Sequence, residues 1–190
     1  MTTFSIIGTG NMAQAIGGVL ARGGAAVQTV AHAETPTLTG DVVILAVPYP
    51  ALADIATRFG AQLDGKIVVD LTNPLDFSTF DALVVPAGSS AAAELAALLP
   101  GATVLKAFNT TFAATLASGT VGGSPTTVLV AGDDAAAKAT LVAAVEAGGL
   151  AALDAGSLAR AHELEAIGFL QLTLAVSEKI SWTAGFNLSR

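Results

Sequence analysis

The turn Gly8-Thr9-Gly10-Asn11-Met12-Ala13 restricts the fold of this chain most, because it joins an apolar run to an amphipathic one. Residues 3–8 predict a strand, and residues 12–22 predict a helix ended by two glycines. The first glycine permits a tight turn, the second lets the backbone approach a pyrophosphate, and Ala13 lets helix and sheet pack closely. We therefore expect Gly8, Thr9, Gly10, Asn11 and Met12 to bind a dinucleotide through the free N–H groups at the helix start. The alternative is a glycine turn that serves packing alone.

Apolar β-rich runs alternate with helical stretches rich in Ala and Leu along the whole chain, which is typical of a parallel sheet covered by helices on both faces. We predict an α/β fold of the Rossmann type, doubly wound around a mainly parallel sheet, with a C-terminal helical segment. The further strands are expected at residues 26–31, 41–47, 66–70, 103–107, 126–131 and 151–154. The further helices are expected at residues 49–59, 90–99, 133–146 and 160–181.

Residues 31–40 are too few for the usual crossover helix, so a bare loop is expected between the second and third strands, with the third strand placed directly beside the second. We expect residues 1–154 to form the nucleotide-binding domain. Residues 155–190 are expected to pack on that domain as a helical segment.

Composition excludes several classes of protein. The 190 residues are 53% hydrophobic and 12% charged, which suits one domain with a large core. The net charge of -7 disfavours a nucleic-acid partner, and the absence of cysteine excludes disulfides, thiolate nucleophiles and Cys-based metal sites. The two histidines, His32 and His162, show no metal-ligand spacing and no triad arrangement, so we expect neither a metal site nor a catalytic triad.

Membrane insertion is not expected. The uncharged run at residues 107–132 is broken by Asn, Gly and Pro and predicts turns and strands, and the apolar stretch at residues 166–177 is too short for a span. The N-terminus lacks the basic region of a secretion signal, so we expect a cytoplasmic location.

Three more strand ends are expected at the crevice where an α/β sheet binds its ligand. They are Ala46-Val47-Pro48-Tyr49, Asn73-Pro74, and Asn109-Thr110 after Lys106-Ala107-Phe108. A single Asn-Pro is usually only a turn, so the argument depends on the convergence of these ends.

The end of the second strand, Ala31-His32, is where the adenosine ribose of a dinucleotide would lie. The absence of an acidic residue favours NADP, with His32 and Thr35 as donors to a 2′-phosphate, although no Arg or Lys stands beside them in the sequence. NAD stays open, because Glu34 would favour it if its side chain turned inward. A solvated loop carboxylate is the alternative for Glu34.

Together these segments resemble the NADP oxidoreductases of the coenzyme F420-dependent type, which reduce or oxidise 8-hydroxy-5-deazaflavin, and also the cytosolic domain of the metalloreductases. The resemblance rests on the glycine turn, on Lys106-Ala107-Phe108-Asn109-Thr110, and on Asp154-Ala155-Gly156-Ser157-Leu158 followed by Glu163-Leu164-Glu165, and it covers nearly the whole chain. The chain departs from the family in carrying Ala31-His32 in place of Ser-Arg, and His162 where relatives commonly have Arg.

Carried over to this sequence, the resemblance implies a role for each part of the crevice. It places the pyrophosphate at Thr9, Gly10, Asn11 and Met12, the adenosine 2′ end at Ala31 and His32, the ribose and nicotinamide side at Ala46, Val47 and Pro48, and the nicotinamide between Asn73-Pro74 and Ala107-Phe108-Asn109.

We therefore expect an oxidoreductase that uses NADP, or NAD, and transfers a hydride between the nicotinamide and a small-molecule acceptor such as a flavin or F420. Such a transfer needs stacked rings more than an acid or base, so no catalytic side chain is assigned. The alternative function is a non-catalytic NADP(H)-binding redox sensor. Lys106 can neutralise charge on the acceptor or form an ordinary ion pair, and Tyr49 can donate to a substrate or serve packing.

The last helix and the segment after it carry more apolar residues than one packed face needs, including Trp182 and Phe186. We expect this part of the chain to close a homodimer and to cover the nicotinamide crevice. The alternative is a helix that serves the core alone.

Overall fold

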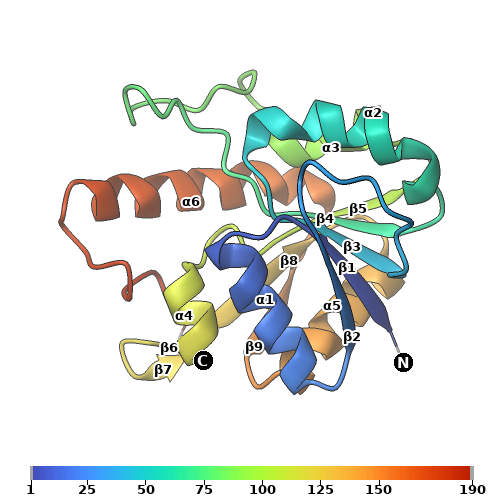
Figure 1. The fold of residues 1–190 in the computed structure, drawn as a ribbon. Coiled ribbons are helices and arrows are strands. Elements are labelled where there is room, and N and C mark those ends of the chain that lie inside the picture. The colour runs from blue at the N-terminus through green and yellow to red at the C-terminus, as the bar shows by residue number, and fades with distance from the viewer. Residues whose placement is uncertain (1, 189–190) are drawn as a thin grey trace.

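The computed structural model describes residues 2–188 and shows a sheet between two layers of helices (Figure 1). The seven-stranded sheet has the order β2-β1-β3-β4-β5-β8-β9, and only the β5–β8 pair is antiparallel among these neighbours. This architecture confirms the prediction of a Rossmann-type, mainly parallel α/β fold with a C-terminal helix.

The strands of the sheet are β1 (Thr3–Ile7), β2 (Ala26–Val30), β3 (Val42–Leu45), β4 (Ile67–Asp70), β5 (Thr103–Ala107), β8 (Thr127–Ala131) and β9 (Ala151–Gly156). A separate hairpin is formed by β6 (Thr120–Val121) and β7 (Ser124–Pro125). The α-helices are α1 (Asn11–Arg22), α2 (Leu52–Leu63), α3 (Ala91–Leu98), α4 (Ala113–Ser118), α5 (Ala135–Ala147) and α6 (Ala161–Val176). Single 3-10 turns precede two of them, η1 (Tyr49–Ala51) and η2 (Leu158–Arg160).

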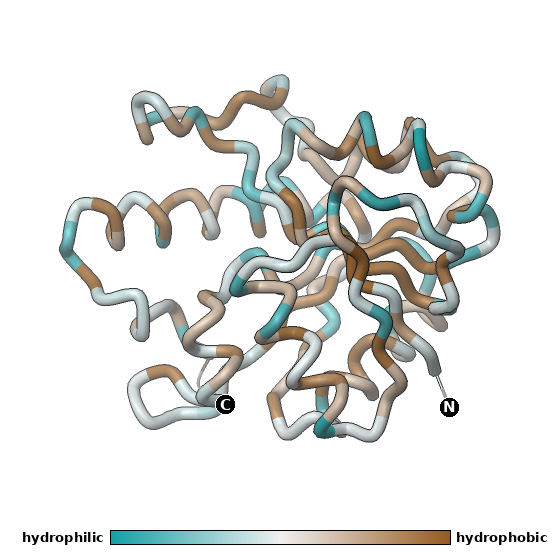
Figure 2. The backbone as a smooth tube through the Cα atoms, in the orientation of Figure 1, coloured by the Kyte–Doolittle hydropathy of each residue, from teal (hydrophilic) through white to brown (hydrophobic). Residues whose placement is uncertain are grey.

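The core lies on both faces of the sheet, because successive strand residues point to opposite sides. In β3, Val42 and Ile44 pack on the side of α1, α4 and α5, whereas Val43 and Leu45 pack on the side of α2 and α3. The central strands are accordingly mostly hydrophobic (Figure 2), and β3 is apolar at every position. Burial on both faces explains why these strands appear in the sequence as continuous apolar runs.

The connection between β2 and β3 has no helix, as predicted, but the two strands are not neighbours. The expectation that they lie side by side is wrong, because β1 lies between them. The loop crosses β1 closely at Gly40, where a Cβ would lie 2.3 Å from the backbone nitrogen of Ser5. Gln28 holds the loop along the edge of β2 by accepting from the Thr39 N–H and donating to the Thr37 carbonyl oxygen.

Two helix expectations also need correction. Residues 107–132 contain α4 as well as turns and strands, and α6 ends at Val176 instead of continuing to residue 181. The end of α6 is set by Glu178, whose φ of 58° turns the chain out of the helix.

The domain boundary expected after residue 154 falls inside β9. Across residues 2–188, no helix has the combined length and hydropathy needed to cross a membrane.

Candidate functional site

The first strand-to-helix turn requires glycine at its first position. Gly8 has a φ of 126°, and its N–H donates to the Val30 carbonyl oxygen at 2.8 Å. A Cβ at this position would lie 2.2 Å from the carbonyl oxygen of Ala46. The end of β1 is therefore wedged between β2 and β3, which leaves no room for a side chain.

The second glycine leaves the start of α1 open. Gly10 is the N-cap residue, no side chain caps the helix, and a Cβ there would meet no atom within 4 Å. Thr9, Gly10 and Asn11 are exposed, whereas Ala13 is buried against the sheet. The first N–H groups of α1 therefore face solvent at the positive end of the helix dipole, which suits a phosphate.

A cavity of about 400 Å³ adjoins this turn at the carboxyl ends of β1, β4 and β5. It is lined by Asn11, Met12, Leu71, Asn73, Asn109, Thr111, Phe112, Ala113, Ala114, Leu172 and Trp182. Most of these side chains are apolar, and the size is within the range typical of pockets for ring-containing ligands. Of the four strand ends that we predicted to converge, those of β1, β4 and β5 line this cavity, whereas residues 46–49 after β3 do not.

Two of the polar residues that line the cavity, Asn73 and Asn109, are hydrogen-bonded to each other. The Nδ2 of Asn73 donates to the Asn109 carbonyl oxygen at 3.0 Å, and the Nδ2 of Asn109 donates to Asn73 Oδ1 at 2.9 Å and to the Leu164 carbonyl oxygen at 2.8 Å. Asn109 is only 5% exposed, and its Oδ1 has no hydrogen-bond partner. This oxygen is a buried acceptor that the fold leaves unpaired in the wall of the cavity.

Helix α6 approaches the asparagines through a glycine. A Cβ on Gly168 would lie 2.2 Å from Asn73 Oδ1 and 3.0 Å from Asn109 Nδ2. The glycine therefore lets α6 pack on the strand ends without displacing the amide pair.

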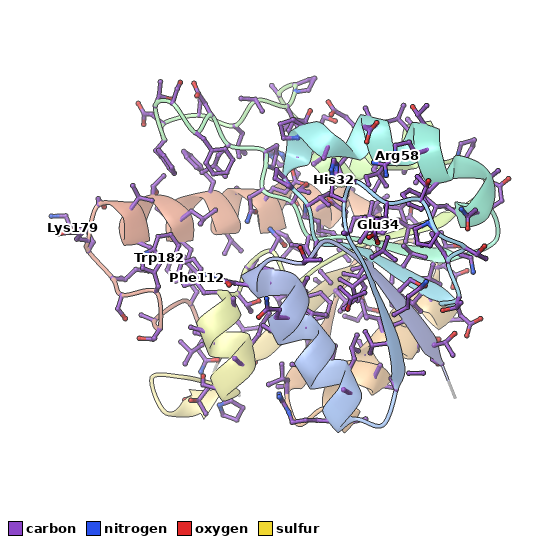
Figure 3. The ribbon with its side chains drawn as sticks, in the orientation of Figure 1. His32, Glu34, Arg58, Phe112, Lys179 and Trp182 are labelled. Carbon is purple, nitrogen blue, oxygen red and sulfur yellow. The ribbon has the colours of Figure 1, made fainter. Side chains whose placement is uncertain are left out.

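Two aromatic residues form one wall of the cavity. The rings of Phe112 and Trp182 lie 4.9 Å apart between centroids, at an interplanar angle of 55° (Figure 3). Phe112 precedes α4 and is buried, whereas Trp182 comes from the C-terminal segment and is 51% exposed. Trp182 and Leu172 thus bring α6 and the segment after it to the cavity, and the expectation that they cover a nicotinamide there stays a prediction.

A buried ion cluster joins β4, β5 and α6. The Nζ of Lys106 lies 2.8 Å from Asp70 Oδ2 and 2.8 Å from Glu165 Oε1, and it also donates to the Thr72 carbonyl oxygen. Glu165 accepts from the Ala91 N–H, and desolvation raises the pKa of its carboxyl group. Lys106 therefore forms an ion pair, the second of its two expected roles, and it has no access to a ligand.

Tyr49 and His162 are also engaged within the fold. The Tyr49 hydroxyl donates to Glu94 Oε2 at 2.6 Å, and this hydrogen bond, with burial, raises the pKa of Tyr49 to about 12. Nδ1 of His162 lies 3.1 Å from the Ser89 carbonyl oxygen. Neither residue lines the cavity.

The structure brings four of the predicted site residues to the cavity, namely Asn11, Met12, Asn73 and Asn109. The other predicted residues do not line the cavity, and they differ in how far they are buried. Ala107 and Phe108 are fully buried in the core, and Phe108 adopts a φ of 65°, which turns the chain sharply after β5. Val47 and Pro74 are also buried, whereas Pro48 is exposed and Ala46 is half-buried.

At the end of β2, the structure adds a cation that the sequence did not reveal. The Nη2 of Arg58, on α2, donates to the Glu34 carbonyl oxygen at 2.7 Å, and its Nη1 lies 2.9 Å from Asp54 Oδ2. His32 Nε2 lies 3.9 Å from the same carboxylate oxygen (Figure 3). The sequence has no Arg or Lys next to His32, but the fold brings Arg58 of α2 to the carboxylate that His32 also approaches.

Comparison with known proteins shows the family of this chain. The model of the family described as "NADP oxidoreductase coenzyme F420-dependent" matches residues 24–74. The F420-dependent NADP reductase of Methanocaldococcus jannaschii is 31% identical over 76% of this chain and 66% of its own length. The chain belongs to the F420-dependent NADP oxidoreductase family.

Three further similar proteins extend the comparison. Metalloreductase STEAP3 of Rattus norvegicus is 38% identical over 73% of this chain, which spans only 27% of that protein's length. A structure of a hypothetical protein from Sinorhizobium meliloti has a TM-score of 0.70 and 32% identity, covering 84% of this chain and 87% of its own. A putative F420-dependent NADP reductase from Arthrobacter sp. FB24 has a TM-score of 0.87 over the whole of both chains at 24% identity, a likeness of fold.

The segment matched by the family model runs from the end of α1 through β4 to Asn73-Pro74. It therefore includes the end of β2, the helix α2 with Arg58, and Asn73 of the cavity.

Proposed function

We propose that this chain transfers a hydride between the nicotinamide of NADP(H) and a flavin- or deazaflavin-like acceptor. The observation that carries the proposal is the apolar cavity that adjoins the open start of α1 and is lined by Asn73 and Asn109 at the ends of β4 and β5. Membership of the family and the similarity to an archaeal F420-dependent NADP reductase support it.

The residues of the site divide the work of binding. The N–H groups of Gly10, Asn11 and Met12 would hold the pyrophosphate, and Asn109 Oδ1 would accept from the carboxamide of the nicotinamide ring. The bound cofactor supplies the hydride chemistry. Met12 and Leu172 would exclude water from the rings, so no acid or base is required of the chain.

Phe112 and Trp182 suit a planar acceptor. Aromatic faces stack on conjugated rings, and Trp182 is half exposed, so an incoming ring can reach it without opening the core. An acceptor held against this wall would lie in the same cavity as the nicotinamide, which is the proximity that direct hydride transfer needs.

The test is hydride transfer from NADPH to FMN, riboflavin and coenzyme F420, measured by absorbance, for the wild type and two variants. Trp182→Leu removes the cavity aromatic, whereas Phe186→Leu removes an aromatic of similar exposure in the same segment that does not line this cavity. We expect Trp182→Leu to lower kcat/KM for the acceptor about tenfold, the scale of one lost aromatic contact. Phe186→Leu should match the wild type.

Two results would count against the proposal. If NADPH binds but no flavin or deazaflavin is reduced, the proposed acceptor is wrong, and if quinones and ferric chelates are not reduced either, the protein is a nucleotide-binding sensor. If both variants lose activity equally, the cavity is not the acceptor site.

A further inference from the structure

We infer that Arg58 recognises the 2′-phosphate of NADP and so sets the preference of this chain for NADP over NAD. The inference rests on the proposed function, because it requires that a nicotinamide dinucleotide binds along the carboxyl edge of the sheet. It assigns to α2 the arginine contact with the 2′-phosphate, because the end of β2 has Ala31-His32 and no arginine.

The position of Arg58 follows from the bare loop after β2. Because no helix fills the connection, α2 packs directly on the loop. Gln62 fastens the two together by accepting from the Leu38 N–H at 2.9 Å and donating to the Pro36 carbonyl oxygen at 3.3 Å. One turn earlier on α2, the guanidinium of Arg58 reaches the Glu34 carbonyl oxygen.

This place is where the adenosine ribose of a bound dinucleotide lies in Rossmann folds. Val30, the last residue of β2, accepts from the Gly8 N–H, so the residues after it stand beside the phosphate-binding turn. His32 directly follows this point, its side chain is half exposed, and it lies near the carboxylate that pairs with Arg58. The guanidinium of Arg58 is thus bonded to the backbone of Glu34, two residues after His32, where the 2′-phosphate is expected.

The chemistry of the guanidinium suits a phosphate. The side chain of Arg58 is 22% exposed, so it is positioned by the fold and still reaches solvent. Its present contacts to Asp54 and Glu34 use only part of its planar set of N–H donors, and the rest can bind phosphate oxygens in pairs.

Substitutions of Asp54 and Arg58 should change the affinity for NADPH in opposite directions. The Asp54 carboxylate holds the guanidinium at 2.9 Å in an i,i+4 pair, and it also competes with a phosphate for the same donors. Removal of the charge by Asp54→Asn should therefore strengthen NADPH binding, whereas removal of the cation by Arg58→Gln should weaken it.

The experiment measures Kd for NADPH and NADH by calorimetry with the full chain. The variants are Arg58→Gln, Arg58→Lys, Asp54→Asn and, as matched control, Arg160→Gln, which removes an exposed arginine paired with Glu163 in a similar helical spacing. We expect Arg58→Gln to raise Kd for NADPH about tenfold or more with less than about a twofold change for NADH. Arg58→Lys should retain part of the preference, and Asp54→Asn should lower Kd for NADPH a few-fold.

The outcomes separate this inference from the proposed function. The inference is overturned if the ratio of Kd for NADH to Kd for NADPH is the same in Arg58→Gln as in Arg160→Gln. It is also overturned if Arg58→Gln and Arg58→Lys weaken the binding of NADPH and NADH equally. In both cases Arg58 does not bind the 2′-phosphate, but the nucleotide site remains supported. If the wild type binds neither nucleotide, the proposed function fails, and the inference fails with it.

Discussion

At the scale of single residues, Tyr49 offers a clean electrostatic test because it is the only tyrosine. Its hydrogen bond to Glu94 raises its pKa from 10.0 to about 12. The folded state thus favours the neutral phenol, so this contact stabilises the fold below pH 10 and loses its effect as the pH rises toward 12. We expect a tyrosinate absorbance titration to show a midpoint near 12, and Glu94→Ala to bring it down toward 10.

Circular dichroism on the same samples is the control, because the protein must stay folded across the titration. A wild-type midpoint equal to that of Glu94→Ala would show that the contact is absent in solution.

The two glycines of the first turn should differ in what they contribute. Gly8→Ala places a Cβ 2.2 Å from the Ala46 oxygen at a φ of 126°, so we expect a loss of about 2 kcal/mol or more in the free energy of unfolding. Gly10→Ala meets open space, so stability should change little while the methyl group blocks the phosphate and weakens NADPH binding.

Urea denaturation and calorimetric titration of both variants check this pair. Equal losses of stability, or normal NADPH binding by Gly10→Ala, would contradict the role assigned to the turn.

The residues of the site were predictable to different degrees. The glycine turn, Asn73 and Asn109 lie at strand ends, so the sequence places them at the crevice. Phe112 precedes α4 and Arg58 lies on α2, and only tertiary packing brings these two to the site, whereas the segment that carries Trp182 was expected there from its apolar residues.

At the scale of elements, Lys106 joins β4, β5 and α6, and through Glu165 it also holds the start of α3. Lys106→Met would leave two buried carboxylates without their cation, so we expect a loss of about 3–5 kcal/mol in the free energy of unfolding. Lys138→Met is the matched control: its partner Asp154 is 55% exposed and stays hydrated, so its loss should be clearly smaller.

Chemical denaturation of both variants measures the difference. If Lys106→Met costs no more than Lys138→Met, the cluster does not hold these elements together.

The elements themselves were largely visible in the sequence. Alternation of β-rich and helical runs gave the strands of the sheet, and the short connection at residues 31–40 gave the bare loop. The helix α4 was missed because it is short and begins at Phe112 without a polar N-cap. The end of α6 was misjudged because apolar residues continue to Ile180, beyond the residue that turns the chain.

At the scale of the whole molecule, α6 and the segment after it expose several large apolar side chains. They are Leu170, Val176, Trp182, Phe186 and Leu188. A homodimer through this face stays a prediction, and sedimentation velocity tests it. A single species of 18.7 kDa would contradict it, whereas a species of twice that mass that is lost in Leu170→Glu would support it.

The central claim is that a nicotinamide dinucleotide lies along the carboxyl edge of the sheet, from the end of β2 across the first turn into the cavity. A crystal structure of the chain grown with saturating NADPH tests it most directly. We predict the pyrophosphate at the N–H groups that begin α1 and the nicotinamide ring beside Asn109 and Trp182. A nucleotide bound elsewhere, or an empty cavity at saturation, would contradict it.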